Sequence, residues 1–206
     1  VVYVPIVEDA NVELDKLNEW AEPKKTAEWQ KQIKAWDEEN PLGMRRDKGM
    51  TPQMIMEHIN KNYKDAIYVT DVGQHQMWAA QFYKFKEPRQ LITSGGLGTM
   101  GYGVGACIGA KMGNKDRVCV NVAGDGCFRM NMNEIATATR YNIPIIQIVI
   151  NNHVLGMVRQ WQTLFYGKRY SATVLDDQVD FVKVSEGMGA KAYSVDTIEE
   201  FEKAFK

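Results

Sequence analysis

The sequence predicts an α/β protein whose parallel sheet carries helices on both faces, and two apolar runs joined by a helix support this prediction. Residues 118–123 and 145–150 are short runs rich in Val and Ile, which is typical of strands buried on both faces of a parallel sheet. Between them, residues 131–141 place apolar side chains at helical spacing, so the three segments form a βαβ unit. Another strand is expected at Ile67–Thr70.

The residues before the sheet are predicted to be largely helical. We expect a strand over residues 1–7 and helices over residues 11–20 and 22–40. The last of these places Trp29, Ile33 and Trp36 on one helical face. These tryptophans could be mistaken for a ligand-binding box, but a packing stripe along one helix explains their spacing.

A boundary is expected near residue 43, because residues 41–43 and 45–49 have the composition of a linker. Thr51 as N-cap and Pro52 at the first helical position then start a new helix. We therefore divide the chain into residues 1–43, the tail of one domain with its linker, and residues 44–206, an α/β domain. Later elements are expected as helices over 101–111 and 179–189, a strand over 191–195 and a helix from 197 onward.

Length and charge limit the possible functions. A chain of 206 residues has room for one good core and a short appendage. A net charge of −1 favours neither nucleic acid nor an anionic membrane as a partner. No apolar run approaches a membrane-spanning length. Because the chain starts with Val and stops within a helical pattern, we expect it to be a piece of a longer polypeptide.

The cysteine count favours a cytoplasmic protein. Cys107, Cys119 and Cys127 are odd in number and lie in or beside apolar segments, a pattern of reduced thiols rather than of a disulfide framework. Cys127 follows the Gly124-Asp125-Gly126 turn and could be reactive, although a small buried structural residue is the more frequent role of such a cysteine.

Two polar side chains are expected to meet at one edge of the sheet. Asp125 follows the first buried run and Asn152 the second, and parallel strands place both at the carboxyl edge, where α/β proteins bind ligands. A carboxylate and an amide oxygen suit Mg²⁺, which completes its shell with phosphate and water oxygens. Gly126 is expected to allow a sharp turn and to leave N–H groups free for a diphosphate. Either motif alone would more often be an ordinary turn or loop.

Two further segments are candidates for the same edge. Gln74 and His75 follow Ile67–Thr70 and can donate to phosphate oxygens, although a lone histidine at a helix start is more often a cap or a surface residue. Residues 95–105 hold six glycines in eleven positions, which lets the backbone approach a ligand or another helix closely. This glycine-rich segment lacks the Lys-Ser/Thr ending of a Walker motif and fits a dinucleotide fingerprint poorly.

Taken together, these blocks resemble the thiamine-diphosphate enzymes. Gly124-Asp125-Gly126, a gap of 24 residues and Asn151-Asn152 are similar to the thiamine-diphosphate signature. Within that family, five blocks resemble the large subunit of acetohydroxyacid synthase (acetolactate synthase): residues 73–78, 94–102, 155–162, 164–166 and 169–171. The resemblance covers roughly residues 44–195, and it implies the thiamine-diphosphate-binding fold of a pyrophosphate-binding domain that continues past residue 206.

The resemblance implies a role for each candidate residue. It implies Mg²⁺ held by Asp125, Asn152 and the backbone carbonyl of Val154. It implies thiamine diphosphate held by Gln74, His75, Gly98, Met100, Gly124, Gly126, Cys127 and Asn152, with Met100 supporting the bent cofactor. Met157, Arg159 and Trp161 would shape the pocket for a second 2-ketoacid. Without the resemblance, Met100 would be read as core filling, and an exposed helix tryptophan would suggest an interface.

The implied reaction joins pyruvate to a second 2-ketoacid, either pyruvate or 2-ketobutyrate, with loss of carbon dioxide, as in branched-chain amino-acid biosynthesis. FAD would be present in the full-length protein, which would be a homodimer or tetramer with a possible regulatory small subunit. The essential catalytic Glu is expected in an amino-terminal domain outside this chain, so the chain alone is predicted to be inactive. The alternatives are another thiamine enzyme, such as pyruvate oxidase, glyoxylate carboligase or a 2-ketoacid decarboxylase, and a non-catalytic binding module.

Overall fold

The chain divides into two compact units, Val1–Gly43 and Met44–Lys206. The structure is a computed structural model, and it describes residues 3–44, 47, 49–175 and 179–205. The first two residues of the strand expected over 1–7, and residues 45, 46 and 48 of the expected linker, lie outside this described part.

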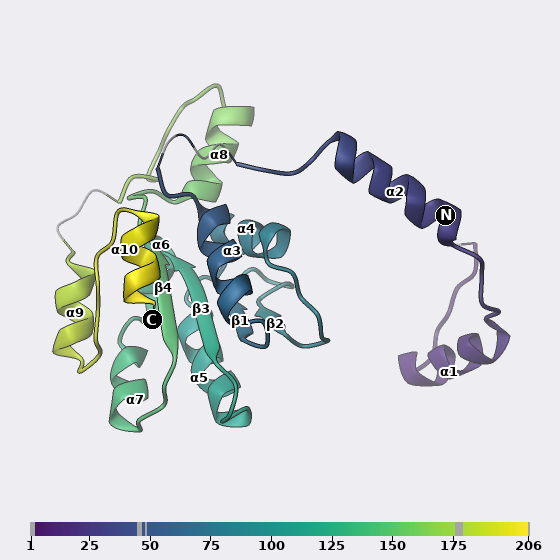
Figure 1. Cartoon of the computed structure of the whole chain (residues 1–206), viewed down its shortest axis with the longest axis horizontal. Helices are drawn as coiled ribbons and strands as arrows, with labels where there is room; N and C mark the ends of the chain where they lie inside the picture. The colour runs from purple at the N-terminus through teal and green to yellow at the C-terminus, as the bar shows by residue number, and fades with distance from the viewer. Residues whose placement is uncertain (1–2, 45–46, 48, 176–178, 206) are drawn as a thin grey trace. The chain divides into compact units, whose positions relative to one another are not determined.

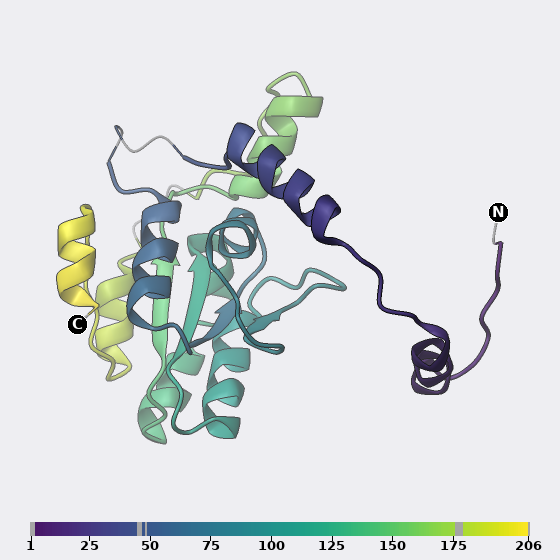
Figure 2. The same ribbon diagram turned by 45° about the vertical axis from the view of Figure 1, so that its right-hand side comes forward.

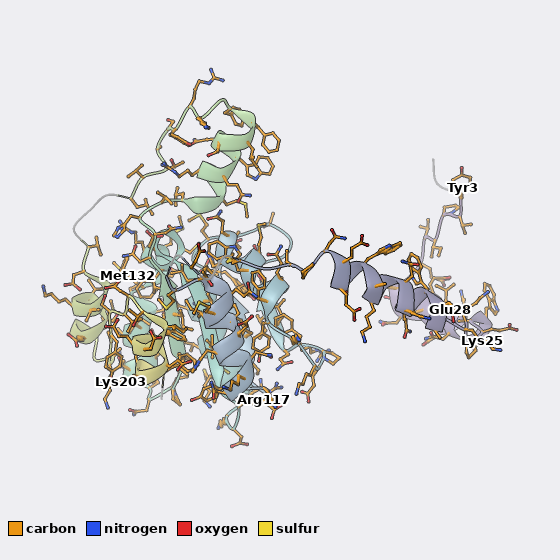
Figure 3. All side chains as sticks on the ribbon, turned by 45° about the horizontal axis from the view of Figure 1, so that its top comes forward. Tyr3, Lys25, Glu28, Arg117, Met132 and Lys203 are labelled. Atoms are coloured by element: carbon orange, nitrogen blue, oxygen red, sulfur yellow. The ribbon has the colours of Figure 1, made fainter. Side chains whose placement is uncertain are left out.

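The first unit contains helices α1 (Ala10–Trp20) and α2 (Ala27–Glu39), so both helices predicted there are confirmed. Its described side chains are exposed or half-buried, and Figure 3 shows those of Tyr3, Lys25 and Glu28 projecting from the ribbon. The face of α2 that carries Trp29, Ile33 and Trp36, predicted as a packing stripe, is exposed, and the two tryptophan rings contact each other edge to face with centroids 5.5 Å apart. The strand predicted over 1–7 is wrong for residues 3–7, because a strand needs a hydrogen-bonded neighbour and no described strand pairs with them.

The second unit is built on a parallel sheet of four strands in its described part. These are β1 (Ile67–Thr70), β2 (Leu91–Thr93), β3 (Cys119–Gly124) and β4 (Ile146–Ile150), in the order β2-β1-β3-β4. All three pairings are parallel, and Gly124 lies opposite Ile150 in the last of them. The strand predicted over 191–195 is wrong, because these residues pair with no described strand. Strand β2 was not foreseen, since three residues are too few for a pattern.

Helices cover both faces of the sheet, so the predicted fold class is confirmed. On one face, α3 (Pro52–Asn62), α4 (Gln74–Phe82) and α10 (Ile198–Ala204) pack over Tyr68, Val120 and Val122. Figures 1 and 2 both show α10 beside α3, although the two are far apart in sequence. On the other face, α5 (Gly103–Gly113), α6 (Asp125–Asn131) and α7 (Glu134–Arg140) cover the alternate side chains of the strands.

The remaining helices follow β4. Helix α8 (Gly156–Phe165) lies beyond the carboxyl edge of the sheet (Figure 1), and α9 (Phe181–Gly187) packs with α6 through an edge-to-face contact of Phe181 and Phe128. Thr51 caps α3 as predicted, accepting a hydrogen bond from the Met54 N–H. No helix in the described ranges combines the length and the apolar character needed to cross a bilayer.

The helix predicted over 131–141 is confirmed as α7, but a further helix precedes it that was not predicted. This helix, α6, runs from Asp125 to Asn131. The glycines on either side of Asp125 have low helix propensity and so suggested a turn. In the structure, Gly124 is the N-cap of α6 and Gly126 lies in its first turn. The helix therefore starts directly at the carboxyl edge of the sheet.

The strand order creates a crevice at that edge. From β1 the chain moves outward to β2, then crosses back to place β3 on the other side of β1. The connections that leave β1 and β3 consequently run in opposite directions. In open α/β sheets, ligands bind at such a point, outside the carboxyl ends of the strands.

Candidate functional site

A pocket with a volume of about 70 Å³ lies in this crevice. A buried water needs only about 10–15 Å³ of such space, so the pocket can hold an ion together with several oxygen ligands. Four segments line it: residues 72–75 and Trp78 after β1, Met100 of the glycine-rich segment, residues 124–127 at the start of α6, and residues 150–158 except 151 and 153. The pocket thus brings together residues that were singled out from four separate stretches of sequence.

Asp125 is the first residue of α6 and is only 1% exposed. Its Oδ2 atom is buried without a hydrogen-bond partner. Burial raises the pKa of this carboxyl, and the backbone N–H groups of Gly126 and His153 oppose that effect only in part. A buried carboxylate oxygen without a partner is costly. A cation in the pocket would remove that cost.

The segment after β4 is held so that the Val154 carbonyl stays available. Val154 forms an antiparallel bridge with Val174, made by Leu155 N–H to the Thr173 carbonyl (2.8 Å) and Leu175 N–H to the His153 carbonyl (2.8 Å). In such a non-hydrogen-bonded pair, the N–H and C=O of Val154 itself point away from the partner segment. The Val154 N–H donates to the Asn152 side-chain oxygen at 3.2 Å. Asn152 and Val154 both line the pocket with Asp125.

His153 does not line the pocket, whereas Asn152 and Val154 on either side of it do. The residue has a φ of 57°, a left-handed conformation that non-glycine residues adopt infrequently, and its side chain is exposed. Its backbone N–H faces the Asp125 carboxylate.

His75 is buried in the pocket wall and is electrically neutral at physiological pH. The side chain is 5% exposed, and its Nε2 atom has no hydrogen-bond partner. Burial lowers the pKa of the imidazole to about 4, although Asp71 opposes this. A Cβ atom on Gly73 would lie 3.0 Å from the ring and one on Gly124 3.1 Å from it. Both glycines therefore allow the ring to lie against the backbone.

Gln74 lines the pocket at the first position of α4. Its side-chain NH₂ donates to the Gln160 side-chain oxygen of α8 at 2.9 Å. Its side-chain oxygen lies so close to Gly156 that a Cβ atom there would clash with it. Gln74 therefore connects α4 to the start of α8, on opposite sides of the crevice.

Gly126 lies in a closely packed helical turn rather than in a sharp loop. A Cβ atom at this position would lie 2.5 Å from Cδ2 of Leu155 and 3.3 Å from Cδ1 of Leu175. The earlier explanation, a sharp turn after Asp125, is wrong because Gly126 lies within the first turn of α6. Its backbone N–H is still among those that a helix leaves without an internal partner.

Cys127 has a structural role. Its thiol is buried and donates to the Val72 carbonyl at 3.0 Å. Burial raises the pKa of the thiol to about 12, so the reactive thiolate is scarce at neutral pH. Cys107, Cys119 and Cys127 are all free thiols.

The glycine-rich segment contributes Met100 to the pocket. Gly98 is not among the lining residues; its φ is 67°, and a Cβ atom there would lie 3.6 Å from the side chain of Val72, which does line the pocket. Gly101 also has a positive φ of 83°. The neighbouring Leu97 is 96% exposed, so the tip of the segment is open to solvent.

Asp71 is a buried residue that the sequence analysis did not assign to the site. It directly follows β1 and is fully buried. Its Oδ1 accepts hydrogen bonds from the N–H groups of Val72 (3.2 Å) and Gly101 (2.8 Å), and its Oδ2 accepts one from Gly103 (3.0 Å). An acidic residue directly after a buried strand was the available signal, since a buried carboxylate needs partners.

Helix α8 brings one of its three predicted residues to the pocket. Met157 lines it, whereas Arg159 and Trp161 lie further along the helix. The Arg159 guanidinium lies 4.3 Å from the centre of the Tyr170 ring. Trp161 is 56% exposed and contacts Phe165 edge to face, with ring centroids 5.5 Å apart.

The ligand set fits a hard cation bound together with phosphate. Within the described ranges, no cluster of three or more His, Cys, Asp or Glu side chains could hold a metal ion. Asp125, Asn152 and the Val154 carbonyl provide one carboxylate and two neutral oxygens. Mg²⁺ is usually held by one or two carboxylates plus phosphate and water oxygens, so these residues fit it.

Comparisons with known proteins agree with this geometry. Residues 71–206 match the family "Thiamine pyrophosphate enzyme, C-terminal TPP binding domain". The chain is 47% identical to the acetolactate synthase large subunit of Corynebacterium glutamicum, over 97% of this chain and 34% of that protein. It is 41% identical to the acetolactate synthase large subunit of Pyropia yezoensis, over 89% of this chain and 31% of that protein.

A solved structure has the same fold. The thiamine diphosphate-dependent 4-hydroxybenzoylformate decarboxylase of Rhodococcus jostii superimposes with a TM-score of 0.73 at 25% identity, over 81% of this chain and 32% of that chain. The chain thus spans about a third of the length of the curated relatives that it matches.

Proposed function

The chain belongs to the family of C-terminal thiamine-pyrophosphate-binding domains of thiamine enzymes, and from this we propose that it is the cofactor-anchoring part of an acetolactate synthase large subunit. The whole protein would condense pyruvate with pyruvate or 2-ketobutyrate and release carbon dioxide, in branched-chain amino-acid biosynthesis. The observation that carries the proposal is the buried, unpartnered Oδ2 of Asp125, which lines one pocket with Asn152 and Val154.

Each side of the pocket has its own task in this proposal. Asp125, Asn152 and the Val154 carbonyl hold Mg²⁺, and the N–H groups at Gly126 and Cys127 and the side chains of Gln74 and His75 bind the diphosphate. Because His75 is neutral, its free Nε2 can donate to a phosphate oxygen without adding a buried charge. Thiamine diphosphate, when bound, supplies the carbanion chemistry for decarboxylation and for carbon–carbon bond formation.

The remaining residues orient the cofactor and the second substrate. Gly98 and Met100 support the thiamine rings, and the apolar Met100 side chain also keeps water from them. Met157, Arg159 and Trp161 on α8 shape the pocket for the second 2-ketoacid, and the Arg159 cation suits its carboxylate. The Arg159 contact with Tyr170 would be exchanged for that carboxylate when substrate binds.

Product analysis of the whole protein tests this proposal. With pyruvate, Mg²⁺ and thiamine diphosphate, the expected product is acetolactate, and addition of 2-ketobutyrate should also give 2-aceto-2-hydroxybutyrate. Acetyl phosphate or acetaldehyde as the main product would overturn the assignment in favour of an oxidase or a decarboxylase. Cofactor binding without any product from 2-ketoacids would identify a binding module.

A decarboxylase is the second candidate, because the superimposed solved structure is named as one. The synthase is favoured by identity, which is 47% for the synthase from Corynebacterium glutamicum against 25% for the decarboxylase. We further propose that the whole protein is cytoplasmic and dimeric or tetrameric, carries FAD, and can associate with a regulatory small subunit. Size measurement in solution and the flavin absorption spectrum of the purified whole protein test these points.

A further inference from the structure

Asp71 connects three segments that are far apart in sequence. The first is its own segment, residues 71–75, which ends at the pocket residue His75. Its carboxylate accepts hydrogen bonds from Gly101 and Gly103, 30 and 32 residues further along the chain. The thiol of Cys127, in the first turn of α6, donates to the carbonyl of Val72, whose own N–H donates to the Asp71 carboxylate at 3.2 Å.

These bonds hold the glycine-rich segment at its carboxyl-terminal end. Both backbone polar groups of Gly101 are hydrogen-bonded. The Asp71 carboxylate accepts from its N–H at 2.8 Å, and the Asn131 side chain donates to its carbonyl at 2.6 Å. A Cβ atom on Gly101 would lie 2.9 Å from the Cβ atom of Met130. Toward its other end, Gly95, Gly96 and Leu97 are exposed.

Met100 directly precedes Gly101, the residue held by these two hydrogen bonds. A peptide unit is planar, so fixing the Gly101 N–H also fixes the plane that begins at the Cα atom of Met100. Charge-assisted hydrogen bonds of this kind are short and strong where water is excluded. The position of Met100 in the pocket therefore depends on the Asp71 carboxylate.

We propose that Asp71 is a positioning residue of the thiamine site, which places Met100 and the start of α6 in their cofactor-binding geometry before the cofactor arrives. This inference rests on the proposed function for the identity of the cofactor. Asp71 itself does not line the pocket. It acts through Gly101, Gly103 and Cys127, and the cofactor then binds a site whose ordering cost is already met.

Hydrogen exchange of the unsubstituted whole protein without cofactor is the first test. The amides of Gly101 and Gly103 should exchange slowly, and those of the exposed residues Gly96 and Leu97 should exchange fast. If all four amides exchange fast until Mg²⁺ and thiamine diphosphate are added, the cofactor orders the segment and the proposal is overturned. This measurement needs no activity and stands even if the protein proves to bind a different cofactor.

Asp71→Asn in the whole protein is the second test, because it keeps the shape and replaces one accepting oxygen by a donor. We expect exchange at residues 101–103 to become about tenfold faster, and the affinity for thiamine diphosphate with Mg²⁺, measured by tryptophan fluorescence quenching, to fall about tenfold or more. Asn131→Ala removes the hydrogen bond to the Gly101 carbonyl, and Asn131 is exposed. This variant should show smaller increases in exchange rate and smaller losses of cofactor affinity, and it replaces Asp71→Asn as the test if Asp71→Asn does not fold.

Gln90→Met is the matched control. Gln90 is 1% exposed and also makes several bonds to backbone groups, accepting from Lys86 and donating to the carbonyls of Lys64 and Ala66. It precedes β2, at the edge of the sheet opposite the pocket. This variant should lose stability without losing cofactor affinity. An equal loss of affinity in Gln90→Met, or unchanged exchange at 101–103 in Asp71→Asn, would overturn the proposal.

If the unsubstituted protein does not bind thiamine diphosphate with Mg²⁺ at all, the proposed function fails. The positioning role of Asp71 is then decided by the exchange data alone. Slow exchange at Gly101 and Gly103 that is lost in Asp71→Asn supports it, and fast exchange in the unsubstituted protein overturns it.

Discussion

Asp125 is the residue at which function and stability conflict most directly. Its carboxylate is nearly inaccessible and one of its oxygens lacks a partner, and burial raises its pKa. Such a group destabilises the protein that lacks a cation and becomes favourable when a cation binds. Functional sites often carry local costs of this kind.

Asp125→Asn should therefore act in opposite directions on stability and on binding. Without Mg²⁺, the neutral amide should raise the free energy of unfolding at pH 7, by up to about 1 kcal/mol, because no buried charge is left unpaired. The affinity for Mg²⁺ with thiamine diphosphate should fall about a hundredfold or more, since the carboxylate ligand is lost. Thermal unfolding with and without Mg²⁺ and cofactor measures both effects. A lower melting temperature in both conditions would contradict the prediction.

His75 should make the cofactor-free protein sensitive to acid. Its pKa is lowered to about 4 in the folded state, mainly by burial, from an ordinary value of about 6.5 in the unfolded chain. Between these values the unfolded state binds a proton that the folded state does not. Stability is therefore fully present above about pH 6.5 and falls as the pH drops toward 4, by about 3 kcal/mol in all.

Denaturant unfolding of the unsubstituted protein and of His75→Asn between pH 7 and pH 4.5 measures this contribution. Asp71 is the charged group that opposes the loss of the proton, and it is present in both proteins. The difference in unfolding free energy between the two proteins should shrink as the pH falls. A difference that stays constant over this range would contradict the assignment to His75.

Among the secondary-structure elements, α6 differs most from the prediction, because it starts at Asp125, where a turn was expected. The motif around Asp125 was correctly placed at the end of a buried strand, but its second glycine was explained by a turn. Only the approach of Leu155 and Leu175, which follow Gly126 by 29 and 49 residues, gives the actual reason. Packing between distant segments leaves no periodic trace in a sequence.

Gly126→Ala should increase the distance between the start of α6 and the segment after β4, which now pack against each other at Gly126 and Leu155. The added methyl group overlaps Leu155, and overpacking of this kind costs about 1–3 kcal/mol of the free energy of unfolding. Affinity for Mg²⁺ should also fall, because Asp125 and Val154 lie on the two sides of this contact. Isothermal titration with Mg²⁺ and thiamine diphosphate, together with denaturant unfolding, measures both effects.

Gly105→Ala provides the matched control for this substitution. Gly105 lies within α5, and a Cβ atom there has no neighbour within 4 Å. Alanine should stabilise the helix by about 0.5–1 kcal/mol and leave Mg²⁺ affinity unchanged. If Gly126→Ala behaves like Gly105→Ala, then the close approach of Leu155 does not constrain the site.

At the scale of the whole molecule, the proposed reaction requires a catalytic carboxylate besides the metal ligand, as the resemblance implies. Asp125 is the only acidic residue among the described residues that line it, and Asp125 is committed to the metal in the proposed function. The chain also spans about a third of the length of its curated relatives. We expect the missing acid to come from outside residues 1–206.

Residues 1–206 alone should therefore produce no acetolactate from pyruvate in the presence of Mg²⁺, thiamine diphosphate and FAD. The whole protein under the same conditions is the positive control, and colorimetric detection of acetoin after acidification measures the product. Clear turnover by residues 1–206 would show that the catalytic groups are all within them. Binding of Mg²⁺ and cofactor to the same sample should be measured in parallel, so that a lack of turnover can be separated from a lack of binding.

The sequence by itself determined the α/β class, three of the four described strands, most helices and the meeting of Asp125 with Asn152 at one edge. Side-chain periodicity is set by burial along each element, and the direction of parallel strands fixes which ends coincide. Only the folded chain shows where α6 starts, that the strands predicted over 1–7 and 191–195 are absent at the described residues 3–7 and 191–195, and which N–H groups bind the Asp71 carboxylate. Each of these depends on a partner distant in sequence, since a strand needs a neighbouring edge and a buried carboxylate needs donors that only the folded chain brings to it.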